Sequence, residues 1–153
     1  MPVTGNLETI KATTITATGL TDEFIDDVDL RLQSLGYTVS ESDSWAVAFA
    51  VQSVVNRIKN ECNIAAVPEG LIQVAVDMVC GEFLLAKKSS GGLEGFNVDL
   101  NSAALKQTQS GDTNVVFAVE GVNSAEQRLD TVIKWLINYG KSQFITYRRI
   151  KWT

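Results

Sequence analysis

Histidine is absent from the 153 residues of this chain. Without an imidazole there is no Ser-His or Cys-His nucleophile pair, no base that titrates near neutral pH and none of the common zinc sites. Most familiar hydrolase chemistry is therefore excluded. We expect a protein that is not an enzyme and that uses neither a cofactor nor a metal ion.

Cysteine is scarce, because Cys62 and Cys80 are the only two in the chain. Both lie in segments of helical pattern, without CxxC spacing and without a neighbouring ligand residue. The sequence favours two buried thiols over a disulfide or a metal site.

Long apolar runs are also missing. The longest uninterrupted run, WAVAFAV at 45–51, is far shorter than the roughly 20 residues that span a bilayer. No basic-then-apolar leader precedes the body. We therefore expect a soluble protein made in the cytosol, with one core, since a chain of this length can hardly bury two.

Positive charge is rare until the end of the chain. Residues 1–130 contain 8 Lys and Arg and 18 Asp and Glu, a net charge of −10 (8 − 18). Residues 131–153 contain 5 Lys and Arg and no Asp or Glu, a net charge of +5. The basic part ends in YRRIKW at 147–152, in which three basic residues lie between two aromatic ones. The body is acidic and the C-terminal segment is basic.

Apolar residues recur at helical spacing in four segments, at about 21–36, 43–62, 68–88 and 124–140. Their ends carry the expected signals, which are acidic residues in the first turn of the first helix, a proline at the start of the third, and an S-x-x-Q capping box at the start of the fourth. The second and third are apolar on several faces, which predicts burial on several faces, in part against other copies of the chain.

The remaining segments predict less regular structure. Residues 1–20 are rich in Thr and read as an extended arm, and 89–102 are polar and Gly-rich, without the GK[ST] ending of a phosphate-binding loop. The runs ALKQTQ and NVVFAV flank SGD, which predicts a β-hairpin near 103–119. The alternation in 141–153 predicts an extended strand. The expected fold is mainly α, a bundle of about four helices over 21–140 with a hairpin and two extended arms.

Two charged clusters have alternative interpretations. Asp22, Asp26 and Asp29 recur on one side of the first helix, but without the ligand order of a calcium loop they favour a solvated acidic face over a metal site. The basic C-terminal segment is compatible with nucleic-acid binding, with a plain solubilising end or with docking on a protein. The acidic body argues against the first, and the alternating aromatic and aliphatic residues favour addition of a strand to another protein's sheet.

The order of these features resembles the head-tail connector, or adaptor, proteins of long-tailed bacteriophages. The resemblance covers roughly residues 43–153 and includes a helix that ends near a Cys-Asn pair, a Pro-Glu-Gly helix start, a Gly-Asp-Thr turn before a strand and a Tyr-Arg-Arg-like end. The residues that carry it most clearly are Pro68, Glu69, Gly70, Gly111, Asp112, Thr113, Arg148 and Arg149.

The resemblance implies a structural virion protein, made in the bacterial cytoplasm and placed at the head-tail interface. Such a protein forms a ring, here expected to have twelve copies, between the portal protein and a tail-side connector or stopper protein. DNA would pass through the ring without specific binding, along a channel faced by Asp22, Asp26 and Asp27. The residues implied in portal docking are Ile145, Tyr147, Arg148, Arg149, Ile150, Lys151 and Trp152.

Two alternatives belong to other classes of protein. Several short helices and a hairpin can form a small winged-helix-like DNA-binding regulator, but these helices carry Asp and Glu at least as often as Lys and Arg. An enzyme that works with carboxylates alone is the third possibility.

Overall fold

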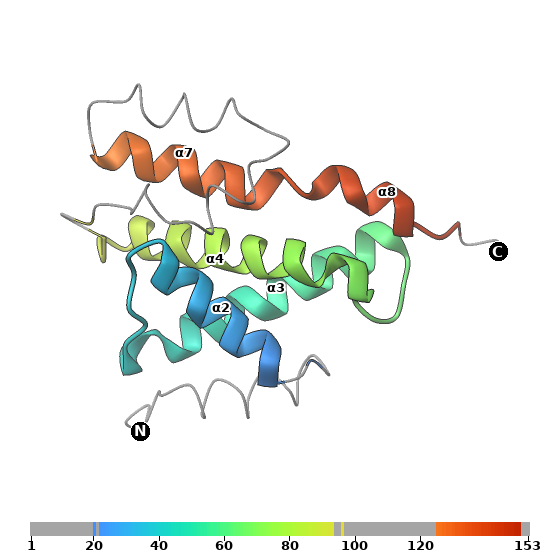
Figure 1. The fold of residues 1–153 in the computed structure, drawn as a ribbon, viewed down its shortest axis with the longest axis horizontal. Coiled ribbons are helices and arrows are strands. Elements are labelled where there is room, and N and C mark those ends of the chain that lie inside the picture. The colour runs from blue at the N-terminus through green and yellow to red at the C-terminus, as the bar shows by residue number, and fades with distance from the viewer. Residues whose placement is uncertain (1–19, 21, 94–95, 97–124, 151–153) are drawn as a thin grey trace.

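The computed structural model describes residues 20, 22–93, 96 and 125–150 (Figure 1). It contains four helices of 13 to 19 residues, which are α2 (Asp22–Ser34), α3 (Ser44–Cys62), α4 (Ile72–Ser89) and α7 (Ala125–Asn138). No strand occurs among the described residues, so the expectation of a mainly helical fold is confirmed there. The predicted hairpin near 103–119, the arm before Leu20 and most of the segment 89–102 lie outside them.

Shorter elements connect the long helices and extend the last one. They are the 3-10 turns η1 (Glu41–Asp43), η2 (Glu69–Leu71) and η3 (Lys141–Gln143) and the one-turn helix α8 (Phe144–Tyr147). Pro68 is extended and precedes η2, so the predicted helix start at this proline is a 3-10 turn that leads into α4. Gly36 ends α2 with a φ of 91°, as its position in the sequence predicts.

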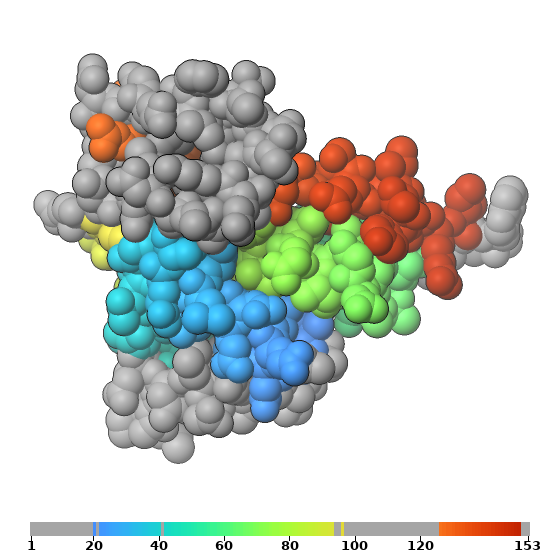
Figure 2. All heavy atoms as spheres, in the orientation of Figure 1, coloured from blue at the N-terminus to red at the C-terminus, as the bar shows by residue number. Residues whose placement is uncertain are grey.

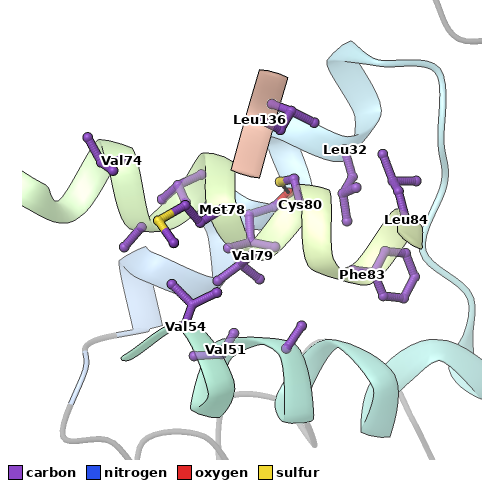
Figure 3. Close-up of a cluster of buried hydrophobic side chains, with 14 of the residues drawn as sticks. Leu32, Val51, Val54, Val74, Met78, Val79, Cys80, Phe83, Leu84 and Leu136 are labelled. Atoms are coloured by element: carbon purple, nitrogen blue, oxygen red, sulfur yellow. Dashed lines mark hydrogen bonds between the residues drawn. The ribbon is translucent and has the colours of Figure 1, made fainter. Parts of the chain in front are cut away.

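Helix α4 is the centre of the bundle, since α2, α3 and α7 each pack against it (Figure 1). Every residue of α4 from Val74 to Gly81 is buried. Figure 3 shows side chains from all four helices meeting around Met78 and Cys80. The middle of α4 is therefore covered within one chain, and its burial does not require other copies, although Leu85 near the end of the helix is exposed.

The apolar stripes predicted for α2 and α7 are confirmed as core faces. The buried members of the two stripes are Phe24, Ile25, Val28, Leu32 and Leu35, and Leu129, Val132, Ile133 and Leu136. Helix α7 approaches α4 closely at Gly81, where an added Cβ would lie 2.7 Å from Ile137 Cγ1. Glycine allows this contact because it has no side chain there.

Both cysteines are free, fully buried thiols, as predicted. Cys80 lies beneath α2, with Sγ 3.7 Å from the Val28 carbonyl oxygen. Cys62 lies beneath α8, with Sγ 3.7 Å from the Phe144 carbonyl oxygen. Burial raises the pKa of each thiol, which disfavours the reactive thiolate.

Asp77 is a buried carboxylate that joins three helices through one side chain. The Arg31 guanidinium of α2 donates from Nε to Asp77 Oδ1 at 2.7 Å, and the Tyr139 hydroxyl, just after α7, donates to Oδ2. Trp135 stacks on Tyr139 with ring centroids 4.4 Å apart. Burial raises the pKa of Asp77, and the favourable contacts from Arg31 and Tyr139 offset only part of that shift.

Asp43, the last residue of η1, is a second buried carboxylate with different surroundings. Its Oδ2 accepts from the Tyr37 hydroxyl at 2.7 Å and from the Ser40 main-chain N–H at 3.0 Å, and Lys87 Nζ lies 2.8 Å from Oδ1. Burial acts to raise the pKa of Asp43, but Lys87, Ser40 and Tyr37 together outweigh it and leave the pKa below its ordinary value. Asp43 thus ties the connection after α2 to the end of α4.

Asp43→Asn should lower the free energy of unfolding by about 1–3 kcal/mol near pH 7, the range for hydrogen bonds to a charged group. A lowered folded pKa means that the stabilisation is present above the unfolded pKa, about 3.9, and is lost as the pH falls through the folded pKa. Denaturant unfolding at several pH values should therefore show the deficit of the variant shrinking below about pH 4. A deficit that is constant with pH would contradict this assignment.

Candidate docking site at the C-terminal segment

The chain continues past α7 and crosses to the far end of the bundle. After Gly140 it forms η3 and α8, and residues 148–150 then leave the body at the right of Figures 1 and 2. The prediction of an extended strand over 141–153 is wrong for 141–147, which are helical. Arg148 has extended angles, φ −68° and ψ 131°, so the extended part begins only there.

The positions of Phe144 and Tyr147 explain why this segment is helical. Phe144 is buried, and Tyr147 is half-buried over η2, where a Cβ on Gly70 would lie 1.7 Å from the Tyr147 hydroxyl oxygen. Residues three apart share one side of a helix but lie on opposite faces of a strand. A helical turn therefore brings both rings to the body, and this burial outweighs the strand-forming composition.

The end of α3 holds the extended residues through main-chain groups. The Arg149 N–H donates to the Cys62 carbonyl oxygen at 2.8 Å, and Asn63 Nδ2 donates to the Arg149 carbonyl oxygen at 3.1 Å. Arg148 Nε donates to the Glu61 carbonyl oxygen at 3.2 Å. Carbonyls in the last turn of a helix lack partners within the helix, and the negative end of the helix dipole favours cations.

Asn63 makes this arrangement possible by ending α3 in the left-handed conformation. Its φ is 55° and ψ is 48°, and its own N–H donates to the Lys59 carbonyl oxygen. Asparagine is one of the few residues that adopt this conformation readily. Its side-chain amide is then directed at Arg149, so one residue both ends the helix and holds the segment.

The predicted docking residues fall into three groups. Ile145 and Ile150 are 72% and 74% exposed, and Arg148 and Arg149 are also exposed. Tyr147 is half-buried against η2. Lys151 and Trp152 lie outside the described residues. The exposed group can offer two guanidinium groups to carboxylates and two aliphatic side chains to an apolar surface.

Strand addition to a partner is constrained by these contacts. Both main-chain groups of Arg149 are already bonded within the chain. Docking as an added strand at this residue would require both bonds to break, whereas docking through the side chains of Arg148, Arg149 and Ile150 would not.

The residues expected to face a channel lie on the first two turns of α2. Asp22 is exposed, and Asp26 and Asp27 are half-buried. Their role in a channel stays a prediction. In the described part of the chain, no three acidic or cysteine side chains gather where they could hold a metal ion. None of the helices described is long and apolar enough to cross a bilayer.

An aromatic pair at the start of α3 is exposed in the single chain. Trp45 is 42% exposed and Phe49 is 65% exposed, and their ring centroids lie 6.3 Å apart. If copies of the chain meet through α3, Trp45 and Phe49 at the start of the helix would be the apolar residues of that contact.

Several residues that build this site were not predicted to do so. The sequence indicates a buried thiol at Cys62, a helix end at Asn63 and part of a helix start at Gly70, and none of these patterns predicts contact with the C-terminal segment. An Asn directly after a helix indicates a left-handed backbone conformation, and a Gly after Pro-Glu indicates that another part of the chain packs closely there. Neither signal identifies which part of the chain makes the contact.

Comparison with family models, with curated proteins and with solved structures finds no significant match for this chain. The fold therefore identifies the described part of the chain only as a mainly helical bundle built around one central helix. Function must be argued from the site itself.

Proposed function

We propose that this protein is a structural component of a tailed-phage virion, a head-tail connector that forms a ring under the portal and provides the platform for the tail. The observation that supports this best is the C-terminal segment, which is fixed on the helical body yet leaves Ile145, Arg148, Arg149 and Ile150 exposed. The order of motifs along the sequence also resembles the order found in the connector family.

The segment is suited to docking because it is already ordered. Phe144 and Tyr147 fix α8, and the end of α3 fixes Arg149. A partner therefore does not have to supply the full entropy cost of ordering a loose tail. Each guanidinium group can form a bidentate contact with a carboxylate of the portal, which a lysine cannot reproduce.

The charge distribution suits passage of DNA better than binding of DNA. Helix α2 carries five acidic residues and a single basic one, Arg31, which is buried against Asp77. An acidic lining repels phosphate, whereas a DNA-binding regulator needs a basic recognition helix. We therefore place the regulator behind the connector.

Deletion of residues 145–153 tests this function in assembled particles. Because the four long helices and their core residues remain, the truncated protein should stay folded and helical by circular dichroism, although it loses the anchors at Tyr147 and Arg149. Phage that carry only this variant should yield filled or leaking heads without tails, because the portal contact is lost. Electron microscopy of particles is the readout.

A matched control is the double substitution R148K/R149K, which keeps the charge but loses the bidentate geometry. It should join heads less efficiently than the unaltered protein and more efficiently than the deletion. Normal tailed particles from the deletion would show that the segment is a plain end and would refute portal docking.

A further inference from the structure

A groove opens between the start of α2 and the start of α4, and the proposed function does not use it. Its volume is about 540 Å³. The lining residues divide into an apolar group and a polar group. The apolar ones are Leu20, Phe24, Val67 and Ile72, and the polar ones are Glu23, Asp27, Glu69 and Gln73. We call this feature the acidic groove.

The charges of the acidic groove are open to a partner. Glu23 and Glu69 are exposed and Asp27 is half-buried. Among the described residues, none of these three carboxylates forms a salt bridge with a cation of the chain, unlike Asp43 and Asp77. An apolar floor with carboxylates around it fits a ligand that combines aliphatic or aromatic side chains with positive charge.

We propose that the acidic groove binds the C-terminal segment of a second copy of this chain. That segment is the complementary surface on the molecule itself, because Arg148 and Arg149 are exposed and Ile150 is 74% exposed. Lys151 and Trp152 follow directly in the sequence. The guanidinium groups would meet the groove carboxylates, and Ile150 would lie on the apolar floor.

Because the groove and the segment are different surfaces of one chain, copies can join head to tail through this contact. Such heterologous contacts close into rings when the rotation between copies allows it and otherwise form open chains. The inference deepens the ring of the proposed function, because it names the surfaces through which copies would meet, and it does not depend on portal docking. A portal would compete with the neighbouring copy for the same segment.

The test uses a fluorescent peptide of residues 144–153 and measures its anisotropy with the purified full-length protein. The groove variant E23Q/E69Q removes two charges without changing side-chain shape. It should weaken peptide binding by about three- to tenfold at low salt, the size expected for two partly exposed ion pairs. The control variant D29N/E126Q removes two charges elsewhere and should change binding less than twofold.

Two further measurements separate a specific contact from general attraction. A peptide with the same composition in scrambled order should bind more weakly. Only the true order places the guanidinium groups at the groove carboxylates and Ile150 on the apolar floor. A peptide with Arg148→Glu and Arg149→Glu should bind the E23K/E69K protein better than it binds the unaltered protein. Sedimentation of the unaltered protein should also show self-association that decreases with salt.

The proposal is overturned if E23Q/E69Q and D29N/E126Q bind the peptide equally well, or if the scrambled peptide binds as tightly as the true one. The acidic body would then attract any basic peptide. Neither result would affect portal docking, because the peptide assay contains no portal, whereas the deletion in particles removes both contacts of the segment.

Discussion

Asp77→Ala should lower the free energy of unfolding by about 3–5 kcal/mol, the range measured when one partner of a buried ion pair is removed. The substitution deprives the buried Arg31 guanidinium of the carboxylate 2.7 Å away and removes the acceptor for the Tyr139 hydroxyl. Because Asp77 joins α2, α4 and the end of α7, the loss should affect the whole bundle. Urea unfolding followed by circular dichroism measures it.

Two control variants separate charge from packing. Asp77→Asn keeps the side-chain shape and an acceptor for Tyr139 and should cost less than Asp77→Ala, but it leaves the Arg31 charge unpaired. The double variant R31M/D77L removes that charge as well and should recover much of the loss. If R31M/D77L is as unstable as Asp77→Ala, lost packing rather than the unpaired charge causes the effect.

The pH dependence of Asp77 should have the opposite sign to that of Asp43. A raised folded pKa means that the contribution of Asp77 is fully present below the unfolded pKa, about 3.9, and is lost as the pH rises through the folded pKa. The stability deficit of Asp77→Asn should therefore shrink as the pH rises above about 4. The deficit of Asp43→Asn should instead stay constant above about pH 4 and shrink only below it.

Phe144→Ala should make Cys62 react with a thiol reagent at least about 100-fold faster. Truncating a buried Phe costs roughly 3–5 kcal/mol, and about 2.7 kcal/mol of local destabilisation raises an opening equilibrium 100-fold. The side chain of Phe144 is 2% exposed, and its carbonyl oxygen lies over the Cys62 thiol. Opening of α8 would therefore uncover Cys62.

Cys80 provides the internal control for this experiment, because it is fully buried under α2 rather than under α8. Modification of Cys62 alone, identified by mass spectrometry, would show local opening of the C-terminal segment. Equal acceleration at both cysteines would show global unfolding and would contradict the view of α8 as a separately anchored cover.

The sequence predicts the four long helices because each has an apolar stripe at helical spacing and recognisable ends. It does not predict which helix is central. Helix α4 is apolar on several sides, and that pattern is the same whether the covering surfaces belong to the same chain or to another copy. Only the positions of α2, α3 and α7 around it decide between the two.

The candidate site was predicted in position but not in conformation. The residues from Phe144 to Ile150 are too few for periodicity to separate a strand from a short helix. The deciding facts are long-range, namely burial of Phe144 and contact of Tyr147 with Gly70. The Arg31–Asp77 pair could not be predicted for a similar reason. An Asp within an apolar run indicates that it has a buried partner, but the partner, Arg31, is 46 residues away in the sequence.

The hydrogen bonds between the end of α3 and Arg149 determine which substitutions the C-terminal segment can tolerate. Cys62 and Asn63 contact the backbone of Arg149, which is chemically the same for almost every amino acid. Substitutions of the side chains at 149 and 150 should therefore leave the segment on the same path from the body, because these hydrogen bonds do not use the side chains at either position.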